Sequence, residues 1–91
     1  MSMHIPDKKN IYALLGNHLR KARVSKGLSG NELATIINLS QQQVSRYELG
    51  INKLSLEKLI EIVIFLDIDI NDITNLIVKQ VEHEKSVYSI D

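Results

Sequence analysis

Apolar residues recur every three or four positions along five stretches of the chain, and a good helix-capping residue stands before each stretch. Five helices are therefore expected. The first follows a cap at Asn10 or Asp7 and ends near residue 26, the second runs from Ser29 to 37, and the third runs from 41 to 48. The fourth runs from Ser55 to 66, and the fifth runs from a cap at Asp69 or Asn71 to 81. Residues 1–10 and 82–91 show no such period and read as an N-terminal arm and a C-terminal tail. In the tail, a short strand at Val87, Tyr88 and Ile90 or a loose end is expected. The pattern predicts an all-α domain over residues 11–81.

The central stretch, residues 28–50, predicts two short helices joined by a tight turn. Asn38 tolerates the left-handed conformation that ends a helix sharply, and Leu39 supplies an apolar plug. Ser40 can then cap a helix beginning at Gln41. The inner face of the first helix carries Leu33, Ala34 and Ile37, and that of the second carries Val44 and Tyr47. Packing these faces together leaves polar side chains outside, namely Gln41, Gln42, Ser45 and Arg46.

From Leu15 to Ile73 the chain resembles the Cro/repressor-type helix-turn-helix family, also called the XRE family. The resemblance is carried, in one register without gaps, by Leu15-Gly16, Arg20, Arg23, Lys26-Gly27-Leu28-Ser29, Glu32-Leu33-Ala34, Ser40-Gln41, Val44-Ser45, Tyr47-Glu48 and Gly50. It implies a five-helix fold, binding of double-stranded DNA, and a structural ion pair between Arg23 and Glu48. Residues 28–30 and 40–48 most resemble small regulators of enterobacterial fimbrial operons. Two positions depart from the family: Gly30 stands where glutamine is frequent, and Leu54 where proline is frequent.

Composition restricts the other function classes. Ninety-one residues make one domain, the absence of cysteine excludes disulfides and thiolate chemistry, and no run of 18 apolar residues or basic-then-apolar leader is present. A cytoplasmic protein is expected. The net charge is zero, yet residues 1–53 carry eight Lys or Arg and three Asp or Glu, a balance of +5, whereas residues 54–91 carry three and eight, a balance of −5. One end of the molecule should therefore face DNA and the other should face away.

Each polar residue of the predicted DNA surface has an expected role. The residues expected to read base edges are Gln41, Gln42 and Arg46. Contacts to the phosphate backbone are expected from Arg20, Ser29, Asn31, Gln43, Ser45 and Lys53. For Gln43 and Ser45 the alternative is a solvated, non-reading side chain, and for Arg20 it is a solvated helix face. The basic arm around Lys8 and Lys9 is either a DNA contact or a frayed terminus.

The fourth and fifth predicted helices carry more apolar surface than one small core needs. Residues Leu56, Leu59, Ile62, Val63 and Leu66 form the face assigned to the core. Five further residues lie outside that register and are assigned to a homodimer interface, namely Ile60, Ile64, Phe65, Ile73 and Ile77. For the fifth helix the alternative is packing on the domain's own core.

No arrangement of residues indicates an enzyme, a metal site or a cofactor. His4, His18 and His83 lack metal-ligand spacing, and the four glycines are too dispersed for a phosphate-binding loop. Two functions remain. One is a homodimeric regulator of transcription that binds a two-fold DNA operator, with fimbrial or motility genes as targets. The other is an antitoxin-type protein that holds a toxin through its apolar C-terminal half and represses its own operon.

Overall fold

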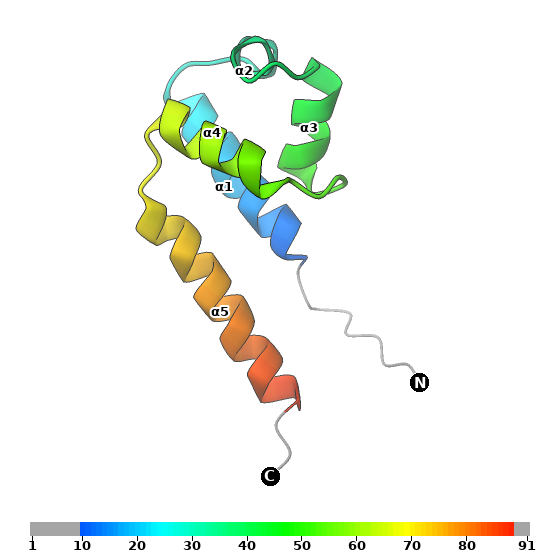
Figure 1. Cartoon of the computed structure of the whole chain (residues 1–91), viewed down its shortest axis with the longest axis vertical. Helices are drawn as coiled ribbons and strands as arrows, with labels where there is room; N and C mark the ends of the chain where they lie inside the picture. Colours follow the sequence, from blue (N-terminus) through cyan, green and yellow to red (C-terminus); the bar gives the residue numbers. More distant parts are fainter. Residues whose placement is uncertain (1–9, 89–91) are drawn as a thin grey trace.

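The computed structural model describes residues 10–88, which form five helices (Figure 1). They are α1 (Ile11–Ser25), α2 (Gly30–Ile36), α3 (Gln41–Leu49), α4 (Leu56–Leu66) and α5 (Ile70–Tyr88). The first four helices form the body, and α5 runs alongside α1 and then projects away from it (Figure 1). The expected all-α class is confirmed. The expectations for residues 1–9 and for Ile90 lie outside the described residues.

The helices begin where the capping residues predicted. The Asn10 side chain accepts the backbone N–H of Tyr12 at 2.8 Å, and Ser55 caps α4 through the N–H of Lys58. Asp69, rather than Asn71, caps α5, because its carboxylate accepts the N–H of Asn71 at 2.9 Å. Each of these side chains accepts a backbone donor that the first helical turn leaves unpaired.

A small apolar core joins all five helices. Its buried members are Leu15, Leu19, Leu33, Ala34, Ile37, Val44, Leu54, Ile62, Leu66 and Ile73. The predicted core face of α4 is confirmed except at Leu56, which is 71% exposed. Leu56 is the first residue of α4 and lines the groove between α4 and α5 instead of the core. Periodicity alone cannot show how far along a helix its packing partners extend.

Helices α1 and α3 approach so closely that only glycine fits between them. A Cβ on Gly16 of α1 would meet the backbone carbonyl of Tyr47 and lie 2.6 Å from that of Glu48. Gly50, which ends α3 at φ +77°, lies equally close to Ala13, since a Cβ there would be 2.6 Å from the Ala13 nitrogen. Both contacts involve backbone atoms that cannot move aside. They fix the position of α3 on α1.

Helix α5 departs most from expectation. It continues through Tyr88, so a strand or loose tail over residues 82–88 is wrong. Beside the body it is held by the buried Ile73, and His18 Nε2 of α1 lies 3.7 Å from Asp72 Oδ2 of α5. The second half carries only intermediate and exposed residues. Amphipathic spacing persists there, and helix propensity is not opposed by any glycine or proline.

Candidate nucleic-acid interface

The connection between α2 and α3 is a tight turn built around a left-handed residue. Asn38 has φ +60°, as its sequence position predicted, and the N–H of Leu39 closes the turn on the carbonyl of Ala34 at 2.8 Å. Leu39 is half-buried and packs against the core. The turn therefore sets α3 across the end of α2 with little freedom. This arrangement is a helix-turn-helix unit.

Both helices of the unit begin with a capping box. Ser29 Oγ accepts the N–H of Glu32 at 3.0 Å while the Glu32 carboxylate accepts the N–H of Ser29 at 2.7 Å. Hydrogen bonding to the Glu32 carboxylate, from the Ser29 backbone N–H first and the Ser29 hydroxyl second, holds the pKa of Glu32 below its ordinary value of 4.5. In α3 the same exchange joins Ser40 and Gln43, at 3.1 Å and 3.0 Å. The start of α2 thus already holds one carboxylate, at the backbone N–H of Ser29.

The capping role of Gln43 was not predicted. Its side-chain carbonyl accepts both the N–H and the hydroxyl of Ser40. The signal was present, because serine followed three residues later by glutamine is the capping-box pattern. From the sequence, Gln43 was expected to contact the DNA backbone or to be a solvated, non-reading side chain. Because the side-chain carbonyl is used in the cap, only the side-chain amide nitrogen of Gln43 is left to contact the DNA backbone.

An ion pair locks the inner face of α3 to α1. Arg23 Nε donates to Glu48 Oε2 at 2.7 Å, and a second guanidinium nitrogen donates to Oε1 at 2.9 Å. The third guanidinium nitrogen donates to the carbonyl of Leu28 at 2.6 Å. Both residues are 9% exposed, and the hydrogen bond with Glu48 raises the pKa of Arg23. The predicted pair is therefore confirmed, and it also ties down the segment before α2.

The outer face of α3 is polar and unobstructed. Gln41, Gln42, Ser45 and Arg46 are all exposed, whereas Val44 and Glu48 are buried on the inner face. Gln42, Ser45 and Arg46 share one side of the helix because they stand three and four residues apart. The structure thus brings together the three residues expected to read bases with one expected to contact the backbone. Arg20, Asn31 and Lys53 are exposed on other elements.

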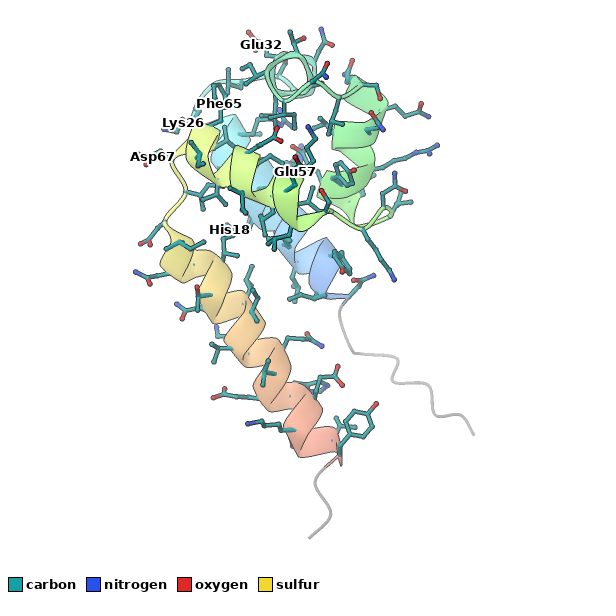
Figure 2. The ribbon with its side chains drawn as sticks, viewed as in Figure 1. His18, Lys26, Glu32, Glu57, Phe65 and Asp67 are labelled. Carbon is teal, nitrogen blue, oxygen red and sulfur yellow. The ribbon has the colours of Figure 1, made fainter. Side chains whose placement is uncertain are left out.

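The five residues assigned to a dimer interface do not form one patch. Ile60, Ile64 and Ile77 are exposed and line a groove of about 300 Å³ between α4 and α5. Ile73 is 2% exposed, so its assignment outside the core register is wrong: it is the residue that anchors α5 to the body. Phe65 is 40% exposed and does not line the groove. Figure 2 shows Phe65 on the side of α4 nearer α2, away from α5.

Metal sites and membrane-spanning helices were sought among the described residues. Within residues 10–88, no group of three or more His, Cys, Asp or Glu side chains is placed to hold a metal ion. In the same range, no helix combines the length and apolar character needed to cross a membrane.

Comparison with known proteins agrees with the geometry of the α2–α3 unit. The helix-turn-helix family profile matches residues 19–73, which include the whole unit. Two similar proteins are uncharacterised HTH-type transcriptional regulators of Rickettsia conorii and Rickettsia prowazekii. Each is 35% identical over 63 residues, or 69% of this chain, and the match covers 50% and 48% of the respective relatives. The chain therefore spans about half the length of the curated relatives it matches.

No solved structure gives a significant match to this chain. The turn at Asn38, the two capped helices and the family match all point the same way. The chain belongs to the helix-turn-helix family, of the Cro/repressor or XRE type.

Proposed function

We propose that this chain regulates transcription by binding double-stranded DNA in a sequence-specific manner through α3. The observation that carries the proposal is the division of α3 into two faces. Its inner face is fixed by the Arg23–Glu48 pair and by the close contact at Gly16. The polar side chains of its outer face are exposed and are not buried against another helix. A rigid helix with a polar outer face fits the major groove of B-form DNA, which admits one α-helix.

Base reading falls to the first two turns of α3. A glutamine side chain can bond both N6 and N7 of adenine, so Gln41 and Gln42 suit adenine, and Arg46 suits O6 and N7 of guanine. Gln42→Ala should cost about 1–3 kcal/mol at one base position and flatten the preference there. The test is selection of binding sites from random DNA by the wild-type and variant proteins. Identical base preferences in the two selections would contradict this role.

Gln43→Ala provides the matched comparison, because Gln43 is the neighbouring glutamine and belongs to the capping box. It should lower stability and leave the selected sequence unchanged. The grip on phosphates falls to Arg20 and Lys53, and through its free amide nitrogen to Gln43, with Ser29, Asn31 and Ser45 contributing by hydrogen bonds. Such contacts position α3 and carry no sequence information.

Specificity further requires two copies. One recognition helix reads only a few base pairs, so a homodimer on a two-fold operator, with half-sites one DNA turn or ~34 Å apart, is proposed. The groove between α4 and α5, with Ile60, Ile64 and Ile77, is the proposed contact surface. Gel-shift titration on full and half operators from the selected sequences tests this, since a dimer binds the full site far more tightly.

The cellular setting is also a proposal. The resemblance of residues 28–30 and 40–48 to fimbrial-operon regulators supports fimbrial or motility genes as targets of a cytoplasmic regulator. Genome-wide mapping of bound sites tests this directly. The antitoxin function is a second candidate, because the same apolar groove suits a toxin partner. Retention of a distinct protein on the immobilised chain, lost when Ile64 is replaced by a charged residue, would favour it.

A further inference from the structure

Helix α5 carries an apolar stripe along its whole length. Residues spaced by four, three, four, three and four positions share one side of the helix, and they are Ile70, Thr74, Ile77, Val81, Glu84 and Tyr88. This spacing is the seam of a coiled coil. We call it the α5 stripe. It lies beside, and is distinct from, the face on which Ile73 and Leu76 pack against the core.

The two halves of the α5 stripe have different surroundings. The first half, with Ile70, Thr74 and Ile77, forms one wall of the groove, whose other wall is α4. The second half, with Val81 and Tyr88, projects beyond α4 (Figure 1) and is 45% and 71% exposed at these two residues. One chain thus presents both an empty apolar groove and an uncovered apolar helix end. Neither can reach the other within the same molecule, because both lie on one straight helix.

We propose that a second copy of this chain covers this surface, with the two α5 helices antiparallel and the second half of each lying in the groove of the other. The proposal rests on the homodimer proposed above and specifies its interface. With the two-fold axis beside Lys79, the pattern reads the same in both directions. Ile70 then stands opposite Tyr88 of the second copy, Ile77 opposite Val81, and Thr74 opposite Glu84.

The polar positions select this register. Glu84 is the one charged residue of the stripe, and its carboxylate accepts the side-chain amide of Gln80 at 2.9 Å. In this register it also meets the hydroxyl of Thr74, which can donate a second hydrogen bond. Sliding the helices by one heptad carries Glu84 past Ile70, where α5 begins, in one direction and sets it against Val81 in the other. The first leaves Glu84 and Tyr88 with no facing α5 residue, and the second places a charge on an apolar side chain. Beside the stripe, Val78 meets its own copy across the two-fold axis.

The exposed area is sufficient for a stable dimer. Seven apolar residues of the groove and stripe are between 45% and 73% exposed, namely Leu56, Ile60, Ile64, Ile70, Ile77, Val81 and Tyr88. Taking about 200 Å² for each such residue when fully exposed, they offer roughly 800 Å² per copy, which is the area each partner contributes to an interface of standard size. In a monomer, the groove and the projecting end of α5 would both stay exposed to water.

Cysteine pairing tests the register, and the chain contains no cysteine of its own. Ile77→Cys and Val81→Cys proteins are prepared separately, mixed, and oxidised mildly. The mixture should give a disulfide-linked dimer, because the two positions face each other across copies. Each protein alone should not, since two copies of residue 77 are offset by four residues, ~6 Å along the helix axis, which is too far for a disulfide. A mixture of Ile77→Cys with Tyr88→Cys is the negative control.

Light scattering gives an independent readout. Val81→Asp should convert the dimer to a monomer at micromolar concentration with its helical circular dichroism retained, because Val81 lies outside the core. Asn75→Asp, an exposed change on the opposite side of α5, should remain dimeric. Crosslinking of each single variant alone, a dimer that survives Val81→Asp, or a monomeric wild-type chain would overturn the proposal. If these outcomes reject the interface while the protein still selects specific DNA sites, the proposed DNA function stands and only this interface is wrong.

Discussion

The ion pair between Arg23 and Glu48 offers the sharpest test of how α3 is held. The guanidinium group makes three hydrogen bonds of 2.6–2.9 Å, two to the carboxylate and one to the carbonyl of Leu28. The side chains of Arg23 and Glu48 are 11% and 8% exposed, so water cannot replace a missing partner. Arg23→Met keeps most of the aliphatic stem and removes every donor. It leaves the carboxylate buried with its charge uncompensated.

The expected cost follows from that geometry. Removing one partner of a buried pair costs about 3–5 kcal/mol, because the remaining charge stays desolvated. Glu48→Leu should cost a similar amount. The double variant should cost much less than the sum of the two, because no charge remains buried, and the difference defines a coupling energy of several kcal/mol. Glu48→Gln keeps one acceptor and should cost about 1–3 kcal/mol.

Urea unfolding followed by far-ultraviolet circular dichroism measures these free energies. A domain of this size has a total stability of only about 5–15 kcal/mol. Glu48→Gln therefore supplies a measurable member of the series even where a single charge removal unfolds much of the protein. Single variants that each cost less than about 1 kcal/mol and whose effects simply add would refute the reasoning. They would show that α3 is positioned by apolar packing alone.

Three further predictions concern separate elements. Gly16→Ala should destabilise the fold by about 1–3 kcal/mol or more in thermal unfolding, because its Cβ meets α3 backbone, whereas Gly30→Ala, with no atom nearer than 3.9 Å, should be neutral or slightly stabilising. Because the folded-state pKa of Glu32 is lowered, its stabilising effect is present above its ordinary pKa of 4.5 and is lost as pH falls through the lowered value, so Glu32→Gln should flatten the acid limb of the stability curve. Arg20→Ala and Lys53→Ala should each weaken all DNA sequences alike and reduce the salt slope of binding by about one, and a changed sequence preference with an unchanged slope would contradict this.

The sequence predicted local features well where one residue type has one strong physical reason to be present. Serine before an apolar period marked the start of α2, α3 and α4, and Asn38 marked the left-handed turn. The Arg23–Glu48 pair came from the family resemblance and not from spacing. Twenty-five residues separate the two partners, so only knowledge of the fold brings them together.

The sequence predicted less well which of several apolar residues would be covered. Ile73 and Ile77 are four residues apart on α5, yet one is buried and the other half exposed, because α1 contacts only one edge of the shared face. Leu56 satisfies the period of the α4 core face and still lies in water. Periodicity gives the direction of a side chain around its helix. It does not show where the neighbouring helix ends.

The same structural contacts decide which part of α3 is available for the proposed recognition of DNA. The last turn of α3, with Glu48 and the carbonyl of Tyr47, and its C-cap Gly50 are held against α1 by the ion pair and the glycine contacts. Its first turn is held differently, by the capping box with Gln43, whose hydrogen bonds run along the chain rather than across to α1. The first turn is therefore ordered without being covered. That combination holds the backbone of the first turn in place while Gln41 and Gln42 stay exposed, as the proposed reading of base edges requires.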